Sequence, residues 1–334
     1  MLSESESDSS SNDTEILAIL CSVVPDQELP IIERWNQDAH PACSTTEDLE
    51  LSLQNQMDAE KWSAAARLIE HFPSLAHANL NIIIQGERIS CRPLHAVCAR
   101  RLPSLDLLEQ LIAYFPSALC ERDPRGRLPI HLALLRGCCS PSVVRYLCER
   151  SSFALLQKDE DGNVPLHYAC QFASHSILQI VLRACPEAAM VANNKKRLPL
   201  HLVCARNWDL EGPSVCSVLE AFPEATQASD RSNRLPLHWA CDQPLLRYDL
   251  LAALVQQYPG GLLHRDHTGA TPVQLAKRMQ KQYYGEEQGV VLAFLNERTA
   301  RERRNKCVLH NLFAIRMTSE KNKNIIQSPQ FPYG

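Results

Sequence analysis

The chain of 334 residues has little glycine, only 11 residues, and aromatic residues make up 6% of it. No apolar run approaches the ~18 residues that a membrane-spanning helix needs, so we expect no membrane segment. The net charge of −4 is small, which argues against a general binder of nucleic acid or polycations. The acidic, serine-rich start, Met1–Thr14, lacks the basic and apolar parts of a secretion signal. We therefore expect an intracellular, cytoplasmic protein.

Signatures of common enzyme classes are also missing. The sequence contains no P-loop, no G-x-S-x-G, no H-E-x-x-H and no dinucleotide-binding glycine fingerprint. We expect no enzyme activity and no cofactor. The 14 cysteines could indicate a disulfide scaffold, but the chain is far longer than the small secreted proteins that depend on disulfides. Most of them fall among apolar residues, where a free thiol acts as a small hydrophobic side chain.

Proline is plentiful, with 21 residues, and it marks a repeat. The pattern Pro-Leu-His, or Pro-Ile-His in one copy, begins at residues 93, 129, 165, 199 and 236, and a degenerate copy begins at Pro272. Successive prolines lie 34 to 37 residues apart. A period of this size is typical of a stack of small units, so the length of the chain does not set its domain count.

Residues 123–158 show what one unit contains. Asp123 begins a turn in which Gly126 can adopt positive φ. Pro129 suits the first turn of a short apolar helix, where a missing N–H costs nothing. A second helix is predicted from about Ser142, because apolar residues recur there at helical spacing. A loop, Arg150–Lys158, then leads to the next turn.

A turn, a Pro-Leu-His helix and a longer second helix, repeated at this period, resemble the ankyrin repeat, whose pattern is D-x-x-G-x-T-P-L-H-x-A. Its turn is matched by Asp123 with Gly126, Asp159 with Gly162 and Asp266 with Gly269. The resemblance covers residues 87–281, in units that begin near 87, 123, 159, 193, 230 and 266. It implies an all-α solenoid of helix-turn-helix units with short turn or hairpin tips. It also implies that the usual function is to bind another protein through a concave face of turns and first helices.

Two units depart from the family pattern at the turn glycine, where Lys196 and Asn233 stand. Asparagine tolerates the left-handed backbone region, whereas Lys196 would be strained there. The threonine before proline is kept only as Thr271. The hydrogen bond that the family forms between this threonine and the histidine is therefore not available in the other units.

The two ends of the chain are atypical. Residues 1–14 are expected to be a disordered acidic tail, and 15–43 a variable segment that packs on the stack or serves as a docking segment. Residues 44–86 read as a divergent N-terminal capping repeat, with a helix from Trp62 to Phe72. At the other end we expect a capping helix within 282–306 and a disordered tail over 307–334.

The recurring histidines are His95, His131, His167, His201 and His238, and in four units a cysteine follows three residues later. Histidine and cysteine are zinc ligands and also form nucleophilic dyads, so a metal-binding or Cys/His catalytic protein is an alternative reading. Pairs in adjacent units would lie roughly 10 Å apart, the spacing of packed helices, which is too far for one tetrahedral site. We therefore expect histidines that bond the backbone of adjacent turns, cysteines that fill space, and no metal.

The groove positions that the resemblance implies, at the turn tips and the ends of the first helices, are mostly basic. They are Arg88, Arg100, Arg125, Arg127, Arg136, Lys195, Arg197, Arg206, Arg231 and Arg234, opposed by Glu160, Asp161 and Asp242. Phe172 and Trp208 are the expected aromatic anchors, because aromatic side chains dominate binding at such faces. The residues that directly follow a histidine, Tyr168, Leu202 and Trp239, are expected to pack inside the stack.

Together these features predict a monomeric, non-enzymatic scaffold whose concave basic groove binds an acidic segment of a protein partner. Nucleic-acid binding through the same groove is a lesser alternative, because interleaved aromatic residues are missing. The acidic stretch Ser3–Asp8 could also occupy the groove itself. A basic cluster over Arg298–Lys306 is either a solvated helix face or a nuclear import signal, so a nuclear location stays open.

Overall fold

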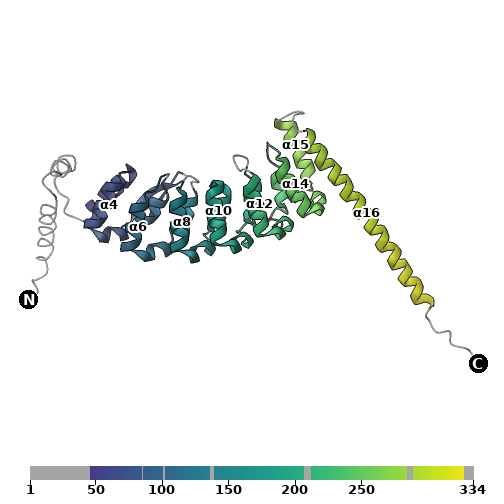
Figure 1. The fold of residues 1–334 in the computed structure, drawn as a ribbon, viewed down its shortest axis with the longest axis horizontal. Coiled ribbons are helices and arrows are strands. Elements are labelled where there is room, and N and C mark those ends of the chain that lie inside the picture. The colour runs from purple at the N-terminus through teal and green to yellow at the C-terminus, as the bar shows by residue number, and fades with distance from the viewer. Residues whose placement is uncertain are drawn as a thin grey trace, which may run out of the picture. The chain divides into compact units, whose positions relative to one another are not determined.

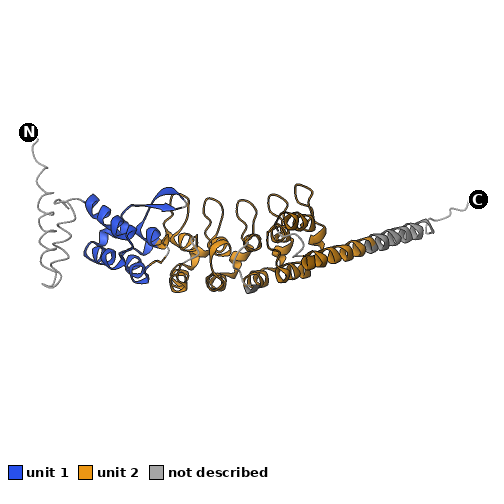
Figure 2. Cartoon of the chain, turned by 90° about the horizontal axis from the view of Figure 1, so that it is seen from above, with its two compact units in different colours: residues 1–97, 104–118 blue, residues 98–103, 119–334 orange. Residues whose placement is uncertain are grey.

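The computed structural model describes residues 46–84, 86–100, 102–135, 139–206, 212–283 and 289–326. The segments 1–14 and 15–43 lie outside these residues. The chain divides into two compact units, coloured separately in Figure 2. Unit 1 comprises residues 1–97 and 104–118, and unit 2 comprises residues 98–103 and 119–334. The first Pro-Leu-His copy, residues 93–95, therefore lies in unit 1, and the copies from Pro129 onward lie in unit 2.

Unit 1 combines helices with one β-hairpin. Its elements are α3 (Thr46–Asp58), α4 (Trp62–His71), the 3-10 helix η1 (Pro73–His77), β1 (Leu80–Ile84), β2 (Glu87–Cys91), α5 (Pro93–Cys98), α6 (Leu105–Tyr114) and the 3-10 helix η2 (Pro116–Cys120), which ends just past it. The helix predicted from Trp62 is α4, which ends one residue before Phe72. The strands were not predicted, although Leu80, Ile82 and Ile84 alternate with exposed residues as in a half-buried strand. They pair antiparallel, with Ile82 opposite Ile89.

Unit 2 consists of two rows of helices (Figure 1). The first row is α7 (Pro129–Leu135), α9 (Pro165–Phe172), α11 (Pro199–Cys204), α13 (Pro236–Cys241) and α15 (Pro272–Tyr283), and each helix contacts the next. The second row is α8 (Pro141–Arg150), α10 (His175–Ala184), α12 (Gly212–Ala221) and α14 (Tyr248–Gln257), again in serial contact. Each second helix buries one apolar stripe, such as Val143, Val144 and Leu147 in α8.

The segments that follow the second helices are 3-10 helices, not the loops expected from the sequence. In unit 2 they are η3 (Ser152–Leu156), η4 (Pro186–Met190), η5 (Pro223–Gln227) and η6 (Pro259–Leu263). Three of the four begin with proline, whose fixed φ and missing N–H suit the first helical position. The same proline ends the α-helix before it, because it restricts the preceding residue.

The last helix is much longer than the sequence indicates. The predicted capping helix ends near Arg304, within 282–306, whereas α16 runs from Gly289 to Ile326. It therefore passes through most of the segment 307–334, for which we expected disorder. We interpreted this part of the sequence as mixed and polar, although Leu309, Leu312 and Phe313 occur in it at helical spacing. Near its start α16 contacts η6 and α15.

The repeated histidine caps the start of its own helix, and at His167 it also reaches the next unit. In unit 2 the backbone N–H of Val164 donates to Nδ1 of His167 at 3.2 Å, and the same bond recurs at His131, His201 and His238. Because Nδ1 accepts, the ring proton is on Nε2. At His167 this proton is directed to the carbonyl of Arg197 at 3.0 Å, and at His131 to that of Gln157 at 3.2 Å. Arg197 belongs to the next unit, so His167 ties two units together, whereas Gln157 lies at the end of the same unit as His131.

These histidines are held neutral. Burial lowers the pKa of His131, His167, His201 and His238 to about 4, against an ordinary value of 6.5. In the degenerate copy Gln274 replaces histidine, and its side-chain Oε1 accepts from the backbone N–H of Thr271 at 2.8 Å. An amide can thus make the helix-capping bond without a titrating group.

The turn tips need left-handed backbone at their third position after the aspartate or asparagine. Gly126, Gly162 and Gly269 adopt it with φ between 72° and 78°. Lys196 and Asn233 adopt it with φ of 56°. The strain predicted for Lys196 is thereby confirmed, because a side chain in this region costs about 1–2 kcal/mol.

We predict that His167→Gln will retain more stability than His167→Ala. The alanine variant loses the helix cap and leaves a buried carbonyl without its donor, which together cost on the order of 2–3 kcal/mol. Urea unfolding of the full chain at pH 7.5 measures this difference. Equal losses in the two variants would show that the capping bond contributes nothing.

Because these histidines are buried and neutral, we predict that the free energy of unfolding decreases at acidic pH. Between pH 6.5 and about 4 the unfolded chain takes up protons that the folded chain does not, so stability falls as pH falls through this window. We expect His167→Gln to reduce this pH dependence, by on the order of 1–3 kcal/mol between pH 7 and pH 4.5. Urea unfolding midpoints across this pH range test it, and a wild-type slope in the variant would contradict it.

Lys196→Gly is expected to raise the free energy of unfolding by about 0.5–1 kcal/mol. Glycine relieves the left-handed strain, and the entropy it adds to the unfolded chain offsets part of that gain. Asn233→Gly is the matched comparison. It should give no gain, because Nδ2 of Asn233 donates to the carbonyl of Arg265 at 2.7 Å and glycine loses that bond. Urea unfolding measures both, and a destabilised Lys196→Gly would refute the strain argument.

Candidate functional site

Each turn in unit 2 is organised by the side chain of its first residue. Oδ1 of Asp230 accepts from the backbone N–H groups of Ser232 at 2.8 Å and Arg234 at 2.9 Å. Asp123 and Asp266 make the same pair of bonds. Oδ1 of the carboxylate thus fixes the turn. The second oxygen, Oδ2, is left to accept hydrogen bonds from other side chains.

An aromatic donor nine residues later satisfies this second oxygen in two turns. The hydroxyl of Tyr168 donates to Oδ2 of Asp159 at 2.6 Å, and Nε1 of Trp239 donates to Oδ2 of Asp230 at 3.2 Å. Tyr168 is buried, as expected, and so is Leu202. Trp239 is only half-buried, so the expectation that it packs wholly inside the stack was wrong.

Arginine satisfies the carboxylate where the ninth residue is leucine. Oδ2 of Asp123 contacts both Nε and a terminal nitrogen of Arg127 at 2.8 Å, and these side chains are 0% and 3% exposed. Arg127 is therefore buried, and its predicted place on an open groove is corrected. Likewise, Nε of Arg234 lies 3.4 Å from Oδ2 of Asp266.

Trp239 lies among paired charges. The guanidinium of Arg197 lies 4.2 Å from the centre of its ring and that of Arg234 lies 5.3 Å away, distances that suit cation–π contact. Arg197 also lies 3.5 Å from Asp230, and Arg234 lies 2.9 Å from Asp242. Much of the positive charge assigned to the groove from the sequence is thus balanced inside the fold.

The turn tips of unit 2 form a row joined by backbone hydrogen bonds. The N–H of Glu160 donates to the carbonyl of Arg125, that of Asn194 to Asp161, that of Arg231 to Lys195 and that of His267 to Ser232, at 2.9–3.1 Å. These bonds hold neighbouring tips in register. We name this surface the tip row.

Two of the predicted basic residues remain exposed on the tip row. Lys195 and Arg231 project from adjacent tips, and Lys196, which the sequence reading did not include, is exposed beside them. Within the described residues no ion pair is formed by these three side chains. Glu160 and Asp161 are exposed on the preceding tip. The tip row therefore has an acidic tip followed by two basic ones.

The remaining residues predicted for the groove differ in location and exposure. Arg125 is half-buried on the tip row, and Arg206 donates to the carbonyl of Ala173 at 2.6 Å. Arg100 is half-buried after α5, and Arg88 is exposed on β2 of unit 1. The predicted anchor Phe172 is half-buried, with its ring 6.5 Å from that of Tyr168. Arg136 and Trp208 lie outside the described residues.

The histidines and cysteines of the repeat are buried. Cys98, Cys170, Cys204 and Cys241 are 0% exposed, and burial raises the pKa of the last three thiols. A raised thiol pKa disfavours the thiolate that zinc binding and nucleophilic attack require. Among the described residues, no group of three or more His, Cys, Asp or Glu side chains is arranged to hold a metal. Nor does any helix in the described ranges have the length and apolarity to cross a membrane.

Comparison with known families identifies the repeat. Residues 94–194 match a family model described as ankyrin repeats, in three copies. The match runs from α5 into the turn that begins at Asn193, and it includes His95, His131 and His167. No curated protein matches the chain. Residues 94–194 thus match ankyrin repeats, and the paired helices and short turns of the chain are consistent with an ankyrin-repeat solenoid.

Proposed function

We propose that this chain is a non-enzymatic scaffold that binds an acidic segment of a protein partner on the tip row of unit 2. Ankyrin repeats are typically protein–protein interaction modules. The observation that carries the proposal is the pair of adjacent tips with exposed Lys195 and Arg231, joined by the bond from the N–H of Arg231 to the carbonyl of Lys195 at 3.0 Å.

Rigidity supports this surface as a binding site. Each tip is fixed by its turn side chain, Asn193 or Asp230, and by its neighbour, so little backbone entropy is lost when a partner binds. Exposed Lys195, Lys196 and Arg231 then present three positive charges on one short stretch of surface. Such a patch speeds encounter with an acidic segment and selects against basic ones.

Charge also predicts how the partner is oriented. Glu160 and Asp161, on the tip before Lys195, would repel carboxylates. The acidic part of the partner should therefore lie over the tips that begin at Asn193 and Asp230, with neutral or basic residues over the tip that begins at Asp159. Phe172 is our candidate aromatic anchor at the end of α9.

Charge reversal tests this surface. We expect Lys195→Glu with Arg231→Glu to weaken partner binding by at least about 10-fold at low salt, because attraction becomes repulsion. The readout is quantitative affinity capture from cell extract with the full chain, in which partners of wild type are identified and their loss in the variant is measured. Arg127 is unsuitable for this purpose, since breaking its buried pair costs about 3–5 kcal/mol.

The matched control is Arg145→Glu with Arg183→Glu, which changes the charge equally on α8 and α10, where both arginines are exposed. Partners lost with the tip variant should be retained with this control, and their binding to wild type should weaken as salt rises. Equal loss in both variants, or retention in both, would overturn the proposal. Retention of labelled RNA that depends on Lys195 and Arg231 would assign the surface to nucleic acid instead.

A further inference from the structure

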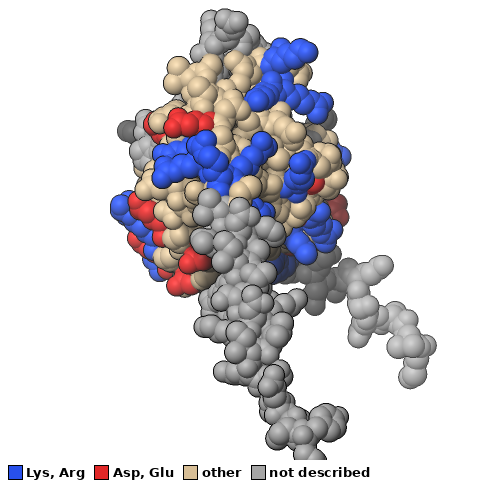
Figure 3. All heavy atoms as spheres, turned by 90° about the vertical axis from the view of Figure 1, so that its right-hand side faces the viewer, with Lys and Arg blue, Asp and Glu red and all other residues tan. Residues whose placement is uncertain are grey.

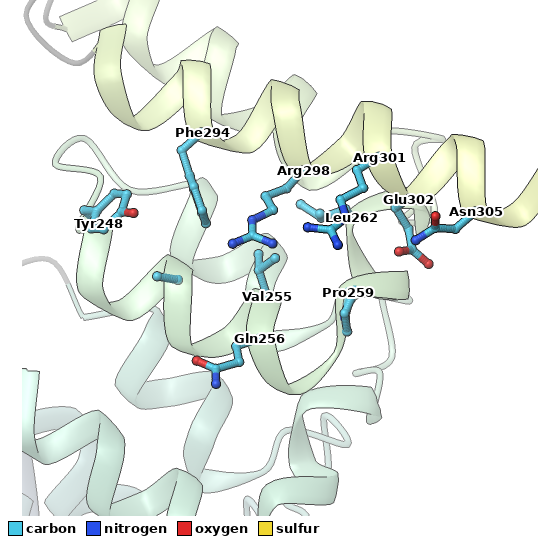
Figure 4. Close-up of a pocket in the computed structure, with 11 residues that line it drawn as sticks. Tyr248, Val255, Gln256, Pro259, Leu262, Phe294, Arg298, Arg301, Glu302 and Asn305 are labelled. Carbon is cyan, nitrogen blue, oxygen red and sulfur yellow. The ribbon is translucent and has the colours of Figure 1, made fainter.

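Unit 2 has a recess where α16 crosses α14 and η6 (Figure 4). None of the residues that line it belongs to the tip row. The recess has a volume of about 370 Å³. This is at the small end of ligand sites and suits one or two side chains more than a cofactor. We name it the seam pocket.

The inner wall of the seam pocket is apolar. Val255 and Leu262 line it and are 4% and 1% exposed. Tyr248 and Phe294 stand at one end, with ring centres 5.0 Å apart at 62°. Tyr248 is nevertheless 48% exposed. An apolar surface of this kind gains free energy when an aliphatic side chain covers it.

Two arginines from α16 line the pocket above this wall. Figure 4 shows the guanidinium groups of Arg298 and Arg301 directed from the helix toward Val255 and Leu262. The Arg298 guanidinium lies 5.5 Å from the ring centre of Phe294. Within the described residues neither arginine forms an ion pair, although Glu302 also lines the pocket. Two guanidinium groups three residues apart on one helix face match a carboxylate.

The surroundings reinforce this charge. Residues 259–307 contain nine Lys and Arg but five Asp and Glu, in a chain whose net charge is −4. On the face seen in Figure 3, Lys and Arg side chains (blue) cover more of the surface than Asp and Glu side chains (red). An acidic ligand would be drawn to this end of unit 2.

We propose that the seam pocket binds a short peptide segment of a partner protein in which an Asp or Glu flanks a large aliphatic residue. The carboxylate pairs with Arg298 and Arg301, and the aliphatic side chain covers Val255 and Leu262. Glu302 and Asn305, at the other end of the pocket, accept hydrogen bonds from N–H groups of the peptide. A bare anion or a nucleic-acid phosphate would leave the apolar wall uncovered and would meet the Glu302 carboxylate.

Fluorescence anisotropy with two synthetic probes tests the chemistry of the ligand. The first is a fluorescein-labelled peptide Gly-Ser-Glu-Leu-Glu-Ser-Gly, and the second has serine in place of leucine. The full chain should bind the first at least about 10-fold more tightly, because only it covers the apolar wall. Equal affinities would overturn the peptide assignment and leave a charge effect alone.

Variants test the site. Arg298→Glu with Arg301→Glu should weaken binding of the leucine probe at least about 10-fold. The control Arg303→Glu with Arg304→Glu makes the same charge change on α16 at exposed residues that do not line the pocket, and should weaken it less than about 3-fold. Equal weakening by both pairs would overturn the proposal.

A third variant keeps the charge unchanged. Ala252 lines the pocket, so Ala252→Trp should fill it and abolish the preference for leucine, with the melting temperature as the check on folding. If Arg298→Glu with Arg301→Glu does not fold, binding of the two probes to wild type and to Ala252→Trp still tests the proposal. Binding of a labelled RNA that competes with the leucine probe, or self-association lost in Arg298→Glu with Arg301→Glu, would assign the pocket to another occupant and refute the proposal.

Discussion

Each short helix of unit 2 that starts with Pro-Leu-His or Pro-Ile-His depends on a hydrogen bond to an unprotonated imidazole. Nδ1 of His167 caps its own helix, and Nε2–H reaches the carbonyl of Arg197 in the next unit. One side chain therefore completes a helix and fixes the neighbouring turn. The capping bond requires an unprotonated Nδ1, and burial ensures this by lowering the histidine pKa to about 4. Local structure and stacking are thus coupled through a single protonation state.

Much of this framework can be predicted from the sequence. Proline at the first helical position, the histidine two residues later and the space-filling cysteine all have roles that follow from their chemistry. His167 makes both the cap and the bond to the next unit, and Cys170 is fully buried. The strain at Lys196 was predictable for the same reason, because the turn demands one backbone conformation regardless of the residue.

The surface was harder to predict. Arg127 and Arg234 read as groove charges, yet the turn aspartates bind them, and which aspartate binds which arginine depends on contacts between units as well as within them. One feature of the sequence does correlate with whether an arginine binds the turn aspartate. Where the ninth residue after the aspartate is Tyr168 or Trp239, the aromatic donates to the carboxylate, and where it is leucine an arginine takes that place. The length of α16 was missed for another reason: apolar residues recur at helical spacing beyond 307, but the mixed sequence there was interpreted as a tail.

The change from histidine to glutamine at position 274 has a consequence for reading arrays of this kind. An imidazole at that position would present an Nε2–H, and within the described residues the next helix after α15 is α16. Gln274 accepts the hydrogen bond from the N–H of Thr271 and its side chain is otherwise exposed. Its remaining polar atoms therefore need no partner from a further repeat unit. In unit 2 each short helix with histidine at this position is followed by another unit, and the one with an amide is the last. The amide suits that place, because it supplies the helix cap without a ring N–H to satisfy.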